Sequence, residues 1–128
     1  MKYDEFIKTV QMAASLDSKE QAKQAVQASL ETLSERILGN EANHLADQLP
    51  EEIGTHLRGR GGEMGERFSL EEFYRRIGNR EGVDGATAAT HARAVFSTIN
   101  SAVTTGEYND IKSNLPPEYK ELFAPGNT

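Results

Sequence analysis

The chain has 128 residues, with 14 Lys and Arg against 20 Asp and Glu, so its formal net charge is −6. This acidic balance argues against nucleic acid as a partner, because domains that bind it are usually basic. The absence of Cys excludes disulfides, thiolate nucleophiles and Cys-ligated metals. No apolar run approaches the ~20 residues that a membrane span needs, and the acidic N-terminus does not resemble a signal peptide. We therefore expect one soluble, cytoplasmic domain over residues 1–128.

Apolar residues recur at helical spacing along the whole chain, and no alternating stretch indicates a strand. This pattern predicts an all-α fold of about eight helices. In the first helix, Phe6, Ile7 and Val10 share one face. Ser18 and Gln21 have the spacing of a capping box and predict the start of a long second helix.

Three residues mark the expected boundaries of the two short helices that follow. Gly39 stands where a left-handed residue can end the long helix. Asn40 can cap the first short helix, and Pro50 suits the first position of the second, because its fixed φ is already helical. Residues 58–67 contain four Gly, which disfavour a helix, so we expect a flexible connector there.

The sharpest start signal in the chain lies just after this connector. Ser69 and Glu72 form a capping box, and Phe68 and Phe73 stand at the positions of a hydrophobic staple around it. We expect this helix to stop near Gly78-Asn79. Asp84 can then cap another long helix, which two short helices follow; the last one opens at Pro116-Pro117.

The second half of the chain repeats the pattern of the first. A shift of 66 residues aligns residues 33–57 with residues 99–123, and the Leu-Pro pairs before the last helix of each half coincide. The identical pairs are Glu41/Glu107, Asn43/Asn109, Leu49/Leu115, Pro50/Pro116 and Glu52/Glu118.

This repeat predicts two similar four-helix halves, 1–57 and 68–124, joined by the connector 58–67 and packed as one helical domain. It also predicts that the two halves superpose as one motif. Pro disfavours the helical conformation of the residue before it, so Leu49 and Leu115 must leave their helices there. We expect both of these side chains to be buried.

Several motifs together indicate a known family. In the first half they are Phe6 to Val10, Ala25-Val26 through Leu30, Leu33, Glu35-Arg36, Leu38, Glu41, Leu45 and Gln48-Leu49-Pro50. In the second half they are Phe68-Ser69-Leu70-Glu71-Glu72-Phe73, His91 to Val95, and Leu115-Pro116 to Leu122-Phe123. Through these residues the sequence resembles the bacterial domain-of-unknown-function family 2267 over nearly its whole length. The resemblance implies a small all-helical bacterial protein with no settled activity and no known catalytic residues.

Glu41 and His44 have a spacing that is typical of a metal site. Residues three apart share a helix face, and Glu-x-x-His helices help to hold di-iron centres in helical bundles. The repeat places Glu107 and Asp110 at the matching positions, so the four side chains could surround one ion. Two further carboxylates are missing, however, and the helix dipole already favours an acid in a first turn. We therefore predict no bound metal and no other cofactor.

The middle of the chain is rich in arginine. The cluster consists of Arg58, Arg60, Arg67, Arg75, Arg76 and Arg80. Guanidinium groups match carboxylates and phosphates, so this cluster could form an interaction surface for an acidic partner or for nucleic acid. Alternatively, the cluster pairs with the acidic flanks of the same chain or is solvated.

No catalytic constellation is recognisable, because no serine sits in a Gly-x-Ser-x-Gly turn and no arrangement requires an acid–base pair. We therefore predict a small non-catalytic interaction or scaffold protein, which binds a partner protein or a second copy of itself. Nucleic-acid binding through the arginine cluster is one alternative. Metal-dependent catalysis through Glu41, His44, Glu107 and Asp110 is the other.

Overall fold

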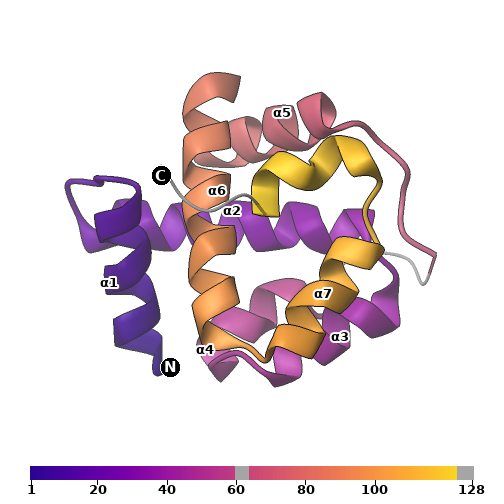
Figure 1. The fold of residues 1–128 in the computed structure, drawn as a ribbon. Coiled ribbons are helices and arrows are strands. Elements are labelled where there is room, and N and C mark those ends of the chain that lie inside the picture. The colour runs from indigo at the N-terminus through magenta and orange to yellow at the C-terminus, as the bar shows by residue number, and fades with distance from the viewer. Residues whose placement is uncertain (60–63, 124–128) are drawn as a thin grey trace.

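The computed structural model describes residues 1–59 and 64–123, and within them every regular element is a helix (Figure 1). The elements, with η for a 3-10 helix, are α1 (Tyr3–Ala13), α2 (Lys19–Arg36), α3 (Gly39–Asp47), α4 (Glu51–Gly54), η1 (Thr55–Leu57), α5 (Leu70–Glu81), α6 (Gly85–Ala102), α7 (Thr105–Ser113) and η2 (Pro117–Phe123). When the continuous α4–η1 stretch is counted once, these ranges hold eight helical segments. The predicted all-α fold of eight helices is thus confirmed.

The bounds of the helices repeat along the chain. The shift of 66 residues maps α2 onto α6, α3 onto α7, and the α4–η1 stretch onto η2 at both of its ends. The packing partners correspond as well, because α1 and α5 each contact both long helices, while η1 packs on α2 and η2 packs on α6. Superposition of the two halves as one motif stays a prediction.

The two long helices, α2 and α6, cross near the middle of the molecule (Figure 1). Helix α5 lies on one side of this crossing, and α3, α4 and α7 lie on the other. The interior is continuous, and the largest fully buried side chains come from both halves and include Phe6, Phe73, Phe96 and Tyr119. Leu49 and Leu115 are 7% and 8% exposed, which confirms their predicted burial.

The predicted helix starts are the most accurate local features. The Ser18 hydroxyl accepts a hydrogen bond from the backbone N–H of Gln21 at 3.2 Å, and the Ser69 hydroxyl accepts one from Glu72 at 3.1 Å. The Asp84 carboxylate caps α6 in the same way, by accepting from Thr87 N–H at 2.7 Å. A short polar side chain satisfies a free N–H of the first turn in each case.

Three predicted boundaries were wrong. Gly39 does not end α2; the chain leaves that helix at Ile37 in an extended conformation, and Gly39 is the first residue of α3, so Asn40 lies inside α3. Pro50 caps α4 instead of occupying its first helical position. Helix α5 continues past Gly78 and ends at Glu81, before the left-handed Gly82.

The described end of the connector also differs from the flexible joint that the sequence predicts. Gly65 has a φ of +73°, and a Cβ atom there would lie 2.8 Å from the carbonyl oxygens of both Arg36 and Ile37. The next residue, Glu66, donates its backbone N–H to the Glu35 carbonyl at 2.7 Å. Residues 64–67 are therefore held against the C-terminal end of α2, because glycine permits a backbone approach that a side chain would block. Residues 60–63 of the connector lie outside the described residues.

Candidate functional site

Most of the predicted arginine cluster is paired within the chain. Four of the six arginines contact a carboxylate: the pairs include Arg58–Asp47 at 2.5 Å, Arg75–Glu72 at 2.6 Å, Arg76–Glu66 at 2.5 Å and Arg80–Glu35 at 2.7 Å. Arg60 lies outside the described residues. Arg67 is exposed and has no ion pair within the part of the chain that the structure describes. This arrangement favours the interpretation that the cluster neutralises its own acidic flanks.

The pairing of Arg76 and Arg80 with Glu35 stabilises the contact between α5 and α2. Arg75 pairs with Glu72 within α5 itself. Hydrogen bonds from Arg75, and to a smaller extent from Arg76, lower the pKa of Glu72 to about 2. A hydrogen bond from Arg80 lowers the pKa of Glu35. Because the pKa of Glu72 is lowered, these ion pairs stabilise the fold at pH values above 4.5, the ordinary pKa of a glutamate. Their contribution to the free energy of unfolding is lost as the pH falls toward the lowered pKa of about 2. The guanidinium groups are already engaged with carboxylates in the folded protein.

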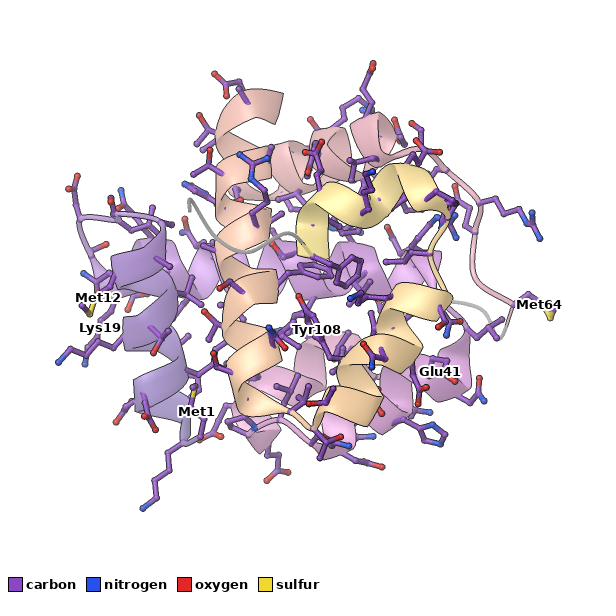
Figure 2. The ribbon with its side chains drawn as sticks, viewed as in Figure 1. Met1, Met12, Lys19, Glu41, Met64 and Tyr108 are labelled. Carbon is purple, nitrogen blue, oxygen red and sulfur yellow. The ribbon has the colours of Figure 1, made fainter. Side chains whose placement is uncertain are left out.

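The four residues of the candidate metal site lie near one another where α3 packs against α7. Burial raises the pKa of Glu107, the charges of Glu41 and Asp110 raise it further, and His44 opposes the rise. Yet among the described residues no group of three or more His, Asp or Glu is arranged to hold a metal ion. Figure 2 shows Glu41 on α3, and one oxygen of Glu41 and one of Glu107 are buried without a hydrogen-bond partner.

The unpartnered carboxylate of Glu107 leads to a prediction about stability. We expect Glu107→Gln to raise the free energy of unfolding at neutral pH by about 1 kcal/mol, because the amide removes a buried charge that lacks a partner. A raised pKa means that Glu107 destabilises the fold only when it is ionised. The gain in unfolding free energy from Glu107→Gln should therefore vanish as the pH falls below 4.5, the ordinary pKa of a glutamate.

Urea unfolding across this pH range measures the effect of Glu107→Gln, with the exposed Glu52→Gln as a matched control from the first turn of α4. Equal stability changes for the two variants at every pH would contradict the account of Glu107.

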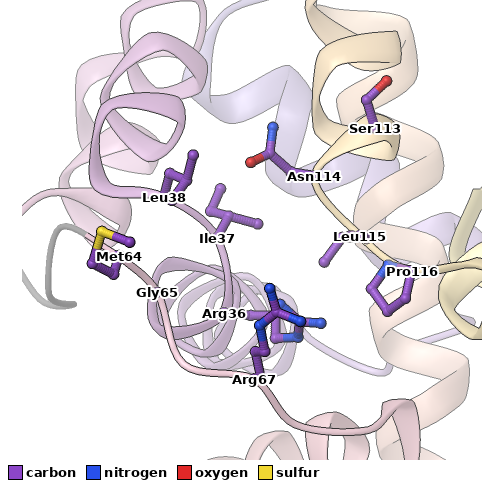
Figure 3. A pocket seen from close by; sticks show the side chains of 10 residues that line it. All are labelled: Arg36, Ile37, Leu38, Met64, Gly65, Arg67, Ser113, Asn114, Leu115 and Pro116. Carbon is purple, nitrogen blue, oxygen red and sulfur yellow. The ribbon is translucent and has the colours of Figure 1, made fainter.

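A groove of about 390 Å³ is the candidate site that the structure itself adds (Figure 3). It lies between the C-terminal end of α2, the described end of the connector and the turn between α7 and η2, and its walls are formed by residues 36–38, 64, 65, 67 and 113–116. We call it the connector groove. Among the described residues, its walls contain two arginines and neither Asp nor Glu, although acids outnumber bases in the chain.

Arg36 occupies a fixed position in the wall of the connector groove. Its Nε–H lies within hydrogen-bond distance of the Phe68 carbonyl at 3.1 Å and of the Tyr119 hydroxyl at 3.2 Å. Its guanidinium carbon also lies over both rings, 5.8 Å from the centroid of Phe68 and 5.2 Å from that of Tyr119. The two Nη groups have no hydrogen-bond partner among the described residues, so the outer edge of this guanidinium is available to a ligand.

Apolar side chains lie beside these guanidinium groups. Leu38 is 38% exposed and Met64 is 82% exposed. Figure 3 shows Leu38 and Met64 on one side of the connector groove and Leu115 and Pro116 on the other. Exposed apolar side chains next to free guanidinium groups are typical of a site that binds a polypeptide segment with apolar and acidic side chains.

Arg67 belongs to the arginine cluster predicted from the sequence, whereas Arg36, Leu38 and Met64 were not predicted as site residues. In the sequence, Arg36 stands in the last turn of a long helix, where the helix dipole alone accounts for a basic residue. The groove is assembled from three segments that are far apart in the chain, so no local motif marks it. The sequence signal that points to the groove is the glycine at position 65, whose positive φ in the structure lets the connector approach α2.

A second hollow, of about 560 Å³, lies between α5 and the start of α6. Its walls contain Glu71 and Asp84 together with one arginine, Arg75. The guanidinium of Arg75 already binds Glu72, and the Asp84 carboxylate caps α6. Two charged groups of this hollow, those of Arg75 and Asp84, are thus engaged within the chain, and we take the connector groove as the candidate site.

The comparison with known families agrees with the resemblance in the sequence. The chain belongs to the family described as an uncharacterized conserved protein (DUF2267), whose family model matches residues 3–122. No curated protein matches the chain. Across the described ranges, none of the helices has the length and apolar character that a membrane crossing requires.

Proposed function

We propose that this DUF2267 protein is a non-catalytic interaction module that binds a segment of a partner protein in the connector groove. The observation that carries the proposal is the composition of the groove. It combines the exposed apolar side chains of Leu38 and Met64 with the guanidinium groups of Arg36 and Arg67, and none of its described lining residues is an acid. Binding grooves for peptides combine apolar contacts with a few polar groups that fix orientation in this way.

The pairing of the arginine cluster favours a protein partner over nucleic acid. Binding to a polyanion needs several phosphate contacts, because each contact contributes by releasing counterions. Arg58, Arg75, Arg76 and Arg80 are paired with carboxylates of the same chain. Arg36 and Arg67 can supply two contacts, which suit one carboxylate better than a length of nucleic acid.

The environment of His91 supports a non-catalytic role. The imidazole is buried and its Nδ1 lies 2.7 Å from a carboxylate oxygen of Glu81, whose side chain is 4% exposed. A general acid or base must reach the proton that it transfers. The buried pair instead connects the end of α5 with α6, as expected for a structural hydrogen bond.

Photo-crosslinking in the native host tests the proposed function. A photoreactive residue in place of Leu38 should capture a protein that the same residue in place of Met12 does not capture. Met12 is a suitable control because it is 70% exposed and lies at the opposite end of the molecule from Met64 (Figure 2). The captured protein, once purified, should bind the wild-type chain and should lose binding to Leu38→Asp. Equal capture at both positions, or unchanged binding to Leu38→Asp, would contradict the proposal.

A further inference from the structure

We infer that the segment bound in the connector groove is acidic, with one Asp or Glu side chain on Arg36 and Arg67 and a neighbouring apolar side chain on Leu38 and Met64. This inference rests on the proposed function and adds the chemistry of the occupant. It follows from three features of the groove: a guanidinium that is held in place, an unbalanced charge and an exposed apolar wall.

The first feature is that the free edge of Arg36 is held in place before a ligand arrives. The Nε edge is fixed by the Phe68 carbonyl and the Tyr119 hydroxyl, and the plane of the guanidinium is packed near two aromatic rings. The Tyr119 hydroxyl is itself fixed, because it donates to the Phe68 carbonyl at 2.6 Å. A guanidinium that is already ordered loses less side-chain entropy on binding, and its two Nη groups match the two oxygens of a carboxylate.

The second feature is the charge of the groove. Elsewhere the described arginines of the predicted cluster have partners, such as Glu72 for Arg75 and Glu35 for Arg80. The described walls of the groove instead hold two guanidinium groups and no acid. A ligand that brings a carboxylate supplies the missing charge, and charge complementarity of this kind selects the partner and speeds association.

The source of this carboxylate is a side chain within a segment. A terminal carboxylate is usually bound by a series of backbone N–H groups, whereas arginine side chains recognise acidic residues within a segment. The charged donors among the described lining residues are the guanidinium groups of Arg36 and Arg67. Near the groove, the backbone N–H groups of Glu66 and Leu115 are already used, since Glu66 donates to Glu35 and Leu115 donates to Lys112.

The third feature is the apolar wall, which defines the neighbouring side chain. Leu38 and Met64 are exposed, whereas two other apolar lining residues, Ile37 and Leu115, are 1% and 8% exposed. A large apolar side chain beside the acidic residue of the ligand would cover the exposed parts of Leu38 and Met64. Met adapts its shape to varied partners, so the apolar residue can differ between ligands while the acid is constant.

Selection from a library of displayed random peptides tests the inference. Peptides retained by the wild-type chain should share an Asp or Glu next to a large apolar residue. A selected peptide should lose about tenfold or more in affinity for Arg67→Gln, because a hydrogen bond between charged groups is lost. Arg67 suits this test because it is exposed and unpaired among the described residues, so the variant should fold. Arg93→Gln, on α6 and outside the groove lining, is the matched control and should leave affinity unchanged.

The outcomes separate the inference from the proposed function. If the selected peptides share no acidic residue but still lose binding to the Leu38→Asp variant, the inference is overturned and the proposed function is left intact. Peptides whose binding is equal for wild type, Arg67→Gln and Leu38→Asp would overturn both. Arg36→Gln serves as a second variant, provided that its unfolding midpoint shows that it is folded at the temperature of the assay.

Discussion

Replacing Phe73 by Ala should destabilise the protein by about 3–5 kcal/mol, which is the usual cost of removing a large buried aromatic side chain. Phe73 is fully buried, and its ring centroid lies 5.5 Å from that of Tyr119 and 6.2 Å from that of Phe96. It therefore joins α5 to α6 and η2 at one point. It also contacts Phe68, as the predicted staple requires, with 6.4 Å between the ring centroids.

A loss of this size is a large part of the total stability of ~5–15 kcal/mol that is typical of small domains. Urea unfolding followed by circular dichroism measures it. Phe73→Leu is the matched control and should cost much less, because it retains most of the buried apolar volume. A loss below about 1 kcal/mol for Phe73→Ala would contradict the central place of this ring.

Leu49→Ala and Leu115→Ala should each cost about 2–5 kcal/mol of unfolding free energy. The two residues occupy matching positions before the Pro of each half, and they are 7% and 8% exposed. Similar losses are expected because the two side chains pack at corresponding junctions, after α3 and after α7. Leu38→Ala is the control, since this Leu is 38% exposed and its loss should cost less than about 1 kcal/mol. A costly change at one position and a neutral one at the other would contradict the equivalence of the two halves.

The fold could largely be predicted from the sequence, because its determinants are local. Ser18, Ser69 and Asp84 each begin a helix with a hydrogen bond that residue type and spacing predict. Some errors arose where a glycine serves packing and does not end a helix. Gly78 lies inside α5, and a Cβ atom there would lie 2.6 Å from the Val83 carbonyl oxygen, so glycine permits the close return of the chain after the helix.

The candidate site was much harder to predict. Arg67 belonged to the predicted arginine cluster, but pairing within the chain occupies Arg75, Arg76 and Arg80, and no sequence rule says which arginines stay unpaired. Arg36 becomes available because Phe68 and Tyr119 fix its inner edge, and these two residues lie 32 and 83 positions away in the chain. Such a site depends on tertiary packing and is not visible in local spacing.

The most direct test of the connector groove is an NMR titration of nitrogen-15-labelled protein with acetyl-Leu-Glu-Leu-Glu-Leu-amide. Amide signals of Leu38, Gly65 and Asn114, which line the groove, should shift with increasing peptide, together with the Nε–H signal of Arg36. The analogue with Gln in place of both Glu residues should produce much smaller shifts, because it lacks the carboxylate. Equal shifts with the two peptides, or shifts confined to the hollow between α5 and α6, would contradict the proposed acidic ligand of this groove.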